Sequence, residues 1–340
     1  MATHHVHRAV IDGLHPAWDP TMPVLTPFHH LPIRVGSFFD PRATDCDLLV
    51  TNERVAVEDD GERFRWRVWG REGTARFLLG TPRVDSPRAF LLPSFYLGWA
   101  HLALTPRSAA PRERGVSFVA SNHARGELAR RRVALALDLA RHVPVHASAG
   151  LRGAFPADAP IRFHDVGPGG AGKKAFLERF TFNLALENEA APGYLTEKVG
   201  DALLAGAVPI YEGAPDVADW LAPGSWVDAT GLDGAALAAR VVTAEREGVP
   251  ELVASRRGRL LTVSHAAMMG RLWELAARIH DDLAAREPDW RDPRRVWRLR
   301  RESATAAEWG VRLARRHVEA SRAGRAARAA WRRLRGLVAR

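Results

Sequence analysis

The chain has 340 residues, enough for two domains, and its 46% hydrophobic content includes no apolar run of the roughly twenty residues that a membrane-spanning helix needs. Its formal net charge is +10, but no nucleic-acid recognition motif accompanies that charge, so we expect no nucleic-acid partner. The single cysteine, Cys46, excludes a disulfide framework, and the first residues lack the apolar core of a secretion signal, so we expect a cytoplasmic protein.

Residues 1–100 are predicted to form one domain, and their pattern favours strands. Residues 47–51 are a short apolar run, and residues 63–69 alternate between large apolar side chains and arginines. Several histidines gather near the start of the chain, but they lack cysteine partners and the regular spacing of a zinc site. We therefore expect no metal site there.

Residues 112–287 are predicted to form a second domain in which strands and helices alternate. The expected elements are, in chain order, a strand over 115–122, a helix over 126–142, strands near 143–145 and over 180–186, a helix with Thr196 as its N-cap, a strand over 207–211, and helices over 233–245 and 251–287. This alternation predicts parallel strands joined by crossover helices. In such sheets the ligand crevice lies beyond the carboxyl ends of the strands.

Polar side chains cluster between the strand over 180–186 and the helix after it. They are Glu187, Asn188, Tyr194, Glu197 and Lys198. A helix N-terminus attracts phosphate, and a lysine in its first turn is unfavourable unless an anion is bound there. Glu197 can accept hydrogen bonds from two sugar hydroxyls, as acidic residues do on ribose. The cluster therefore predicts a nucleotide site; the alternative is that Glu197 and Lys198 are ordinary residues of a first helical turn.

The same stretch carries an ordered series of motifs: Leu-Glu-Asn at 186–188, Tyr-Leu-Thr-Glu-Lys at 194–198, and Gly-Ala-Val-Pro-Ile at 206–210. It resembles, without a gap, the signature of the α1,3/4-fucosyltransferases (glycosyltransferase family 10), F-x-x-x-F-E-N, Y-V-T-E-K and G-x-x-P-[IV]. Leu186 replaces the usual phenylalanine and Leu195 the usual valine. The resemblance covers roughly residues 116–228, and a weaker similarity extends over residues 40–98.

The resemblance implies an α/β protein of the GT-B fold, with two Rossmann-like domains facing a cleft. It implies GDP-fucose as donor, a glycan acceptor, inversion at the anomeric carbon and no obligatory metal or other cofactor. Asn188, Tyr194, Glu197 and Lys198 would contact the donor. An arginine that grips the diphosphate is expected thirteen residues before a strand valine, which gives Arg132 when counted from Val145; its neighbours at 130 and 131 stay as alternatives.

An inverting transfer needs a base, because the acceptor hydroxyl loses its proton as it attacks the anomeric carbon. The segment over 76–93 resembles the family's interdomain region, and counting back from it places Glu72 near the Gly-Glu motif that supplies a carboxylate. Glu72 is therefore the predicted general base. Asp59 and Asp85 remain competitors, and Glu72 as a salt-bridged surface residue remains the structural alternative.

A glycine-rich stretch over 167–174 nearly spells the phosphate-binding loop G-x4-G-K-[ST]. However, Lys174 occupies the place of the hydroxyl residue that would hold Mg²⁺. We therefore favour a loop and short helix leading into the strand at 180 over an ATP site.

The final segment, residues 288–340, is predicted to form a basic amphipathic tail. Residues 291–340 hold sixteen arginines and four acidic residues, an excess larger than the net charge of the whole chain. Basic helices with tryptophans often lie on anionic membranes, so we expect peripheral membrane association; a packed helix with a solvated arginine face is the alternative. Two other functions remain open: a transferase of this fold with another nucleotide-sugar donor, and a non-catalytic basic protein that binds membrane or nucleic acid.

Overall fold

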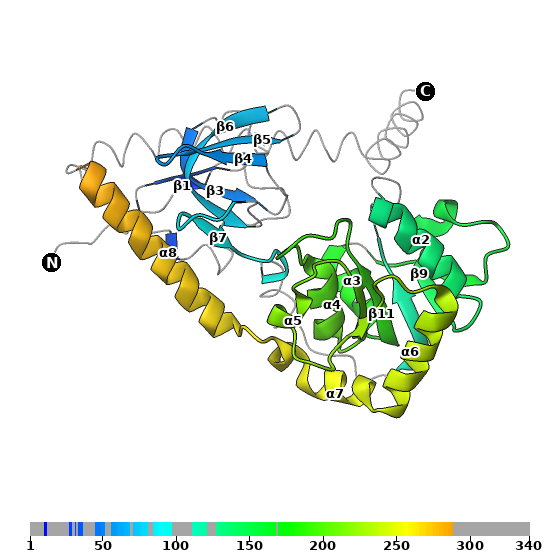
Figure 1. Cartoon of the computed structure of the whole chain (residues 1–340). Coiled ribbons are helices and arrows are strands. Elements are labelled where there is room, and N and C mark those ends of the chain that lie inside the picture. Colours follow the sequence, from blue (N-terminus) through cyan, green and yellow to red (C-terminus); the bar gives the residue numbers. More distant parts are fainter. Residues whose placement is uncertain are drawn as a thin grey trace, which may run out of the picture. The chain divides into compact units, whose positions relative to one another are not determined.

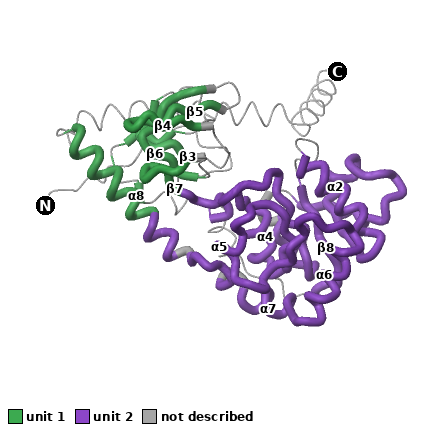
Figure 2. The backbone as a smooth tube through the Cα atoms, viewed as in Figure 1, with its two compact units in different colours: residues 1–90, 272–340 green, residues 91–271 purple. Residues whose placement is uncertain are grey.

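The computed structural model describes residues 10–11, 27–28, 31, 33–36, 45–51, 56–68, 71–80, 84–96, 111–120, 127–167 and 169–287. The chain divides into two compact units, the first made of residues 1–90 and 272–340 and the second of residues 91–271 (Figure 2). This division differs from the predicted boundaries, because the last described helix, α8 (His265–Arg286), belongs to unit 1 from Leu272 onward. The predicted tail at 288–340 lies outside the described residues.

Unit 2 contains a six-stranded parallel sheet in the order β10-β9-β8-β11-β12-β13 (Figure 1). The strands are β8 (Glu113–Phe118), β9 (Val145–Ser148), β10 (Ile161–His164), β11 (Phe180–Leu186), β12 (Val208–Glu212) and β13 (Val227–Asp228). Numbered within the unit, this order is 3-2-1-4-5-6, which is the order of doubly wound nucleotide-binding sheets. The order reverses between β8 and β11, so the ligand crevice is expected at the carboxyl ends of these two strands.

Helices cover the sheet of unit 2. They are α2 (Glu127–Leu139), α3 (Gly169–Leu177), α4 (Glu197–Ala205), α5 (Val217–Trp220), α6 (Gly234–Arg246) and α7 (Val249–Arg256), with 3₁₀ turns η2 (Ala149–Ala154) and η3 (Arg257–Leu260). Figure 1 shows α2 beside α6 and α3 beside α4, and both pairs pack together. Residues 182–187 and 208–212 are all buried, because central strands of a parallel sheet are covered on both faces.

The described residues of unit 1 form a seven-stranded mixed sheet. Along the sheet its strands are β1 (Val10–Ile11), β2 (Arg34–Gly36), β3 (Asp45–Thr51), β6 (Arg71–Gly80), β5 (Phe64–Val68) and β4 (Ala56–Asp59), and β7 (Ala89–Leu91) also pairs with β6. The first four strands along the sheet, β1, β2, β3 and β6, run parallel to one another. Strands β5 and β4 are each antiparallel to their neighbours. The predicted alternation in β5 is confirmed, because Phe64 and Trp66 are buried and Arg65 and Arg67 are exposed.

Helix α8 packs its apolar stripe into unit 1. Leu272, Leu275, Ala276, Ile279 and Leu283 are buried at helical spacings of three and four residues. Polar contacts flank this stripe: Arg286 lies 3.8 Å from Asp47 and Asp282 lies 3.9 Å from Arg76. Among the helices that the structure describes, none combines the length and apolarity needed to cross a membrane.

Candidate functional site

The carboxyl end of β11 and the start of α4 bring the predicted polar residues into one cluster. Glu187 and Asn188 follow the last residue of β11, at the sheet edge where the strand order reverses. The chain then turns back and enters α4 with Thr196 as its N-cap, as predicted, so that Glu197 and Lys198 are the first helical residues. The cluster therefore lies where doubly wound sheets bind their ligands.

Glu187 organises this cluster from inside the protein, since its side chain is 0% exposed. Its carboxylate accepts hydrogen bonds from the backbone N–H of Thr196 at 2.7 Å, from the Thr196 hydroxyl at 2.7 Å and from Nζ of Lys198 at 2.9 Å. Because the Thr196 hydroxyl turns toward Glu187, it makes no capping hydrogen bond to the helix. A buried carboxylate that accepts from these donors fixes the start of α4.

Lys198 carries a positive charge at the N-terminus of α4. Its side chain is 13% exposed, and Nζ also donates to the hydroxyl of Thr196 at 2.8 Å. Burial alone would lower the pKa of Lys198, but the nearby carboxylates of Glu187 and Glu197 outweigh burial and raise that pKa. The ammonium group therefore adds to the positive end of the helix dipole, an arrangement suited to an anion.

Glu197 is exposed to solvent and remains ionised. Packing around its carboxylate raises its pKa, but the ammonium groups of Lys198 and Lys173 and hydrogen bonds from Thr196 and its own N–H bring the pKa down to about 2. At neutral pH the side chain is thus a hydrogen-bond acceptor with no proton to donate.

Arg132 is the arginine of α2 that reaches the cluster. Although it is a long charged side chain, it is 1% exposed, and its Nη1 donates to the Leu186 carbonyl at 3.2 Å and to Oδ1 of Asn188 at 2.7 Å. Its buried Nε has no hydrogen-bond partner among the residues that the structure describes. Burial lowers the pKa of Arg132, against the opposing effect of Glu187 and Glu197, but an arginine remains charged in proteins.

The two neighbouring arginines have other environments. Nε of Arg131 lies 2.8 Å from the Glu212 carboxylate, and its Nη2 donates to the Leu232 carbonyl at 3.1 Å. Arg130 is exposed on the surface of α2. Of the three candidates from the sequence, the structure therefore brings only Arg132 to Asn188.

Asp216, in the segment after β12, holds the loop that carries Tyr194. Both carboxylate oxygens of Asp216 accept from the N–H of Gly193, at 2.8 and 2.9 Å, and Oδ2 also accepts from Nε1 of Trp220 at 3.1 Å. Gly193 has φ of +68°, a conformation that glycine adopts without strain. Tyr194 itself is buried, and it lies close enough to Arg132 to influence that residue's pKa.

The sequence did not indicate the contacts that Lys173, Lys174 and Asp216 make. Nζ of Lys173 lies 2.6 Å from Asp201 of α4, and Nζ of Lys174 lies 2.5 Å from Glu178 in a buried pair. Both lysines lie inside α3, and the pairing of Lys174 argues against an ATP-binding loop at this position. The only signal in the sequence was the lysine pair itself, which does not reveal its partners.

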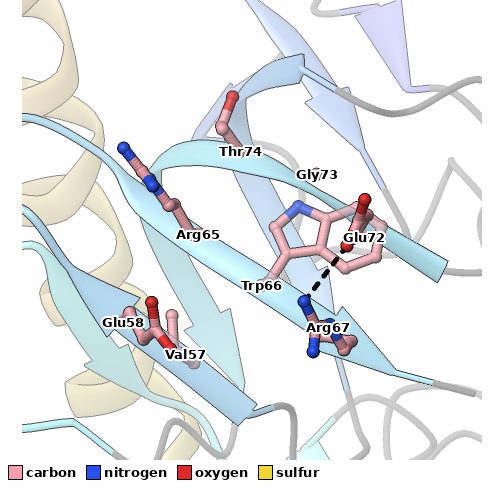
Figure 3. A pocket seen from close by; sticks show the side chains of 8 residues that line it. All are labelled: Val57, Glu58, Arg65, Trp66, Arg67, Glu72, Gly73 and Thr74. Carbon is pink, nitrogen blue, oxygen red and sulfur yellow. Dashed lines mark hydrogen bonds and ion pairs between the residues drawn. The ribbon is translucent and has the colours of Figure 1, made fainter. Parts of the chain in front are cut away.

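Glu72 lies in unit 1, on β6, at the wall of a hollow of about 600 Å³ (Figure 3). The hollow is lined by Val57, Glu58, Arg65, Trp66, Arg67, Glu72, Gly73 and Thr74. The Glu72 carboxylate lies 3.3 Å from Nη2 of Arg67, and the two side chains are 74% and 77% exposed. Of the competitors, Asp59 pairs with Arg88 and Asp85 is exposed.

Within the described part of the chain, no group of three histidine, cysteine, aspartate or glutamate residues could hold a metal ion. The positive charge that the cluster in unit 2 offers to a ligand comes from Arg132, Lys198 and the start of α4. The arrangement can bind an anionic group beside a hydrogen-bond acceptor, Glu197.

The segment that carries this site resembles known proteins. Residues 109–246 match the family described as "Glycosyltransferase family 10 (fucosyltransferase) C-term". Alpha-(1,3)-fucosyltransferase B of Drosophila melanogaster is 47% identical over 45 residues, which are 13% of this chain and 10% of that protein. Alpha-(1,3)-fucosyltransferase FucT of Helicobacter pylori is 45% identical over 56 residues, 16% of this chain and 12% of that protein. The matched segments thus span only about a tenth of these relatives.

Solved structures extend the likeness of the fold to most of the chain. A crystal structure of an alpha1,3-fucosyltransferase with GDP covers 83% of this chain and 92% of its own, at 17% identity and a TM-score of 0.55. One with GDP-fucose covers 71% and 79%, at 19% identity and a TM-score of 0.50. The fold is therefore that of the GT-B class. More particularly, residues 109–246 match the model of glycosyltransferase family 10, the fucosyltransferases, the family that the motifs resemble.

Proposed function

We propose that this protein transfers L-fucose from GDP-fucose to a hydroxyl group of a glycan acceptor, with inversion at the anomeric carbon. The observation that carries the proposal is the placement of Lys198 and the buried Arg132 at the carboxyl edge of β11, beside the start of α4. Similar proteins have been solved with GDP and with GDP-fucose, which supports this choice of donor.

In the proposed donor complex, Arg132 and Lys198 contact the diphosphate. Arg132 offers the charge of a guanidinium held at Asn188, and Lys198 offers an ammonium group already oriented by Glu187. As the bond from the anomeric carbon to the diphosphate breaks, the electron pair stays with GDP. Two fixed cations stabilise that developing charge in the transition state without reorganising. This is the role that a metal ion plays in other nucleotide-sugar enzymes, so we propose that no cofactor is obligatory.

The remaining residues hold the nucleoside and the sugar. Glu197, ionised and exposed, accepts hydrogen bonds from the ribose hydroxyls. Tyr194 and Asn188 shape the pocket around the nucleotide and fucose, and each is fixed by contacts from a different element: Asn188 by Arg132, and the Tyr194 loop by Asp216. This anchoring supports their assignment, because a binding site needs side chains whose positions are set before the ligand arrives.

We propose Glu72 as the general base that takes the proton of the acceptor hydroxyl as its oxygen attacks the anomeric carbon. The support is its position at the wall of an open hollow in unit 1 with further polar residues suited to a sugar, Glu58, Arg65 and Thr74.

The protein is further proposed to act in the cytoplasm, at the surface of an anionic membrane. The support is the composition of residues 291–340, whose sixteen arginines against four acidic residues would be attracted to anionic lipids. Sedimentation with vesicles of phosphatidylserine and phosphatidylcholine, compared with vesicles of phosphatidylcholine alone, tests this. Binding that is equal for both, or absent from both, would contradict it.

The donor assignment is tested by thermal shift with GDP, GDP-fucose, UDP, CMP and ATP, each with Mg²⁺ and with EDTA. A ligand that binds only the folded protein stabilises it by about 2.7 kcal/mol at a hundredfold excess over its Kd. We expect GDP and GDP-fucose to raise the Tm equally in Mg²⁺ and EDTA, and Lys198→Ala to abolish both that shift and fucosyl transfer. Stabilisation by UDP or CMP would indicate another donor. Stabilisation by ATP with Mg²⁺ alone would contradict the proposal.

A further inference from the structure

Tyr194 lies in the loop between β11 and α4, which has no regular secondary structure. Two hydrogen bonds inside the loop shape its turn. The N–H of Tyr194 donates to the Ala191 carbonyl at 3.0 Å, and the next N–H, of Leu195, donates back to the carbonyl of residue 193 at 2.9 Å. These bonds fix the form of the turn but not its place at the sheet edge. That place depends on contacts with other segments of the chain.

The residues on both sides of Tyr194 are held by other parts of unit 2. After it, the Leu195 carbonyl accepts from the N–H of Phe95 at 3.3 Å and from the Ser94 hydroxyl at 3.4 Å. Before it, the N–H of Gly193 is bound by both carboxylate oxygens of the aspartate at 216. The side chain at 91 also lies against this glycine, because a Cβ atom there would be 2.4 Å from a methyl carbon of that leucine.

Trp220, the last residue of α5, connects these two sets of contacts. Its Nε1 donates to Oδ2 of Asp216 at 3.1 Å. Its ring meets the ring of Tyr96 edge to face, with 6.3 Å between the centroids, and Tyr96 stacks on Phe95 at 4.2 Å. The Tyr96 hydroxyl is fixed in turn, since it donates to the Val263 carbonyl at 2.6 Å. Contacts thus run without a break from Asp216 to Phe95.

Both aromatic residues of this network lie inside the protein: Trp220 is 5% exposed and Tyr96 is 2% exposed. The indole N–H binds a carboxylate, and hydrogen bonds to charged acceptors are stronger than those between neutral groups. A smaller ring at position 220 would release this carboxylate and thin the contact with Tyr96. The contacts on both sides of Tyr194 would then loosen together.

We propose that Trp220 is a positioning residue of the donor site: by joining the two sets of contacts around the loop, it keeps Tyr194 in place before GDP-fucose binds. The inference rests on the proposed function, which places Tyr194 beside the nucleotide and the fucose. A loop that is fixed beforehand loses less conformational entropy on binding. Trp220 therefore raises the affinity for the donor without touching it.

The test is a double-mutant cycle on Trp220 and Tyr194, measured by titration calorimetry with GDP-fucose. Trp220→Phe keeps an aromatic ring but loses the N–H that binds Asp216. Tyr194→Ala removes the side chain that Trp220 is proposed to position, and the double variant completes the cycle. The matched control is Trp226→Phe, the same chemical change at a half-buried tryptophan just before β13. The Tm of each free protein is measured alongside, because loss of the indole hydrogen bond lowers stability whatever the role of Trp220.

Trp220→Phe should weaken the binding of GDP-fucose by about tenfold when Tyr194 is present. Once Tyr194 is replaced by alanine, the same change should weaken binding by less than about twofold, because no side chain is left to position. The KM for GDP-fucose should rise in Trp220→Phe while the KM for the acceptor stays the same. Trp226→Phe should leave the affinity for GDP-fucose unchanged.

Equal weakening by Trp220→Phe in both backgrounds, or a lower Tm with no weakening in either, would overturn the inference while leaving the donor assignment intact. Should Trp220→Phe not fold, Leu91→Ala answers the same question, because it empties the space beside Gly193 and should show the same dependence on Tyr194. If Tyr194→Ala binds GDP-fucose as tightly as the wild-type protein, Tyr194 is not part of the site and the inference is wrong. If the wild-type protein fails to bind GDP-fucose at all, the proposed function itself is wrong.

Discussion

Nζ of Lys198 lies 2.9 Å from Oε2 of Glu187, and the carboxylate at the centre of this pair is fully buried. The sequence separates these residues by a loop, but the return of the chain into α4 brings them together at the end of β11. The pair explains why a lysine can occupy the first turn of a helix, where the dipole opposes a cation. Glu187 compensates the charge from inside the protein, so the outer side of the ammonium group is left for an anion.

The first prediction concerns this pair. Removing one partner of a buried ion pair leaves the other charge uncompensated, at a cost of about 3–5 kcal/mol. Glu187→Ala should therefore lower the free energy of unfolding by that amount, and it should also abolish GDP binding, since Thr196 and Lys198 lose their common acceptor. Urea unfolding and calorimetry measure the two effects. Glu251→Ala on the exposed face of α7 is the control, and an equal effect there would contradict the prediction.

Gly213 allows the second prediction, because a side chain at this position would collide with the organising glutamate. A Cβ atom there would lie 2.6 Å from Cγ of Glu187 and 2.6 Å from the hydroxyl of Tyr211, closer than such contacts permit. Gly213→Ala should therefore displace Glu187 and weaken GDP binding about tenfold or more, in addition to lowering the Tm. Gly150→Ala is the matched control, since a Cβ atom at Gly150 meets nothing within 4 Å. Unchanged GDP affinity in Gly213→Ala would show that Glu187 tolerates displacement.

The candidate site could be predicted from the sequence where its residues are close in the chain. The eleven residues from 188 to 198 contain Asn188, Tyr194, Glu197 and Lys198. The pattern of a strand, a loop and a helix in this stretch is enough to group them. The strand pattern of β5, the helices α2 and α6 and the N-cap Thr196 were likewise visible in local periodicity.

Contacts between distant segments could not be predicted in this way. Asp216 supports the Tyr194 loop across 23 positions in the sequence, and Lys173 reaches Asp201 from another helix. Such contacts depend on the strand order 3-2-1-4-5-6, which decides which loops meet at the sheet edge and which no local pattern encodes. The same limit explains why α8 was assigned wholly to the second domain: its apolar stripe shows that it packs, but not on which unit.

A third prediction concerns pH and rests on the pair His146 and His164. Nδ1 of His146 lies 2.9 Å from Nε2 of His164, and the tilted rings of Phe180 and Phe176 pack against His146 and His164 respectively. Burial lowers the pKa of His146 to about 4, with His164, Arg162 and Arg179 adding to this effect and Glu113 opposing it. The folded protein therefore favours the neutral ring more than the unfolded chain does.

Because the pKa of His146 is lower in the folded state, its contribution to stability is complete above about pH 6.5 and is lost as the pH falls toward 4. The free energy of unfolding should decrease by about 3 kcal/mol over this interval from His146 alone. His146→Leu should flatten that slope in urea unfolding at a series of pH values. His142→Asn, at an exposed histidine near the end of α2, should leave the slope unchanged. An unaltered slope in His146→Leu would assign the acid sensitivity to other groups.

The last prediction separates the proposed base from the donor site. Glu72 lies in unit 1 and the GDP-contacting residues lie in unit 2, so Glu72→Gln should leave the affinity for GDP unchanged. Loss of a general base reduces kcat by about 10²–10⁴-fold, so kcat should decrease by this factor in Glu72→Gln. A step that removes no proton from the acceptor should keep its rate. Glu58→Gln, in the same hollow, is the control for a change of charge beside the acceptor. Measuring kcat and the acceptor KM for both variants distinguishes the roles: an effect on KM alone in Glu72→Gln would make this residue part of acceptor binding.

In that case the general base would be sought with the variants Asp59→Asn and Asp85→Asn. Of the two, Asp59→Asn should destabilise the fold more, because Asp59 pairs with Arg88 and its carboxylate accepts the N–H of Gly61 at 2.9 Å.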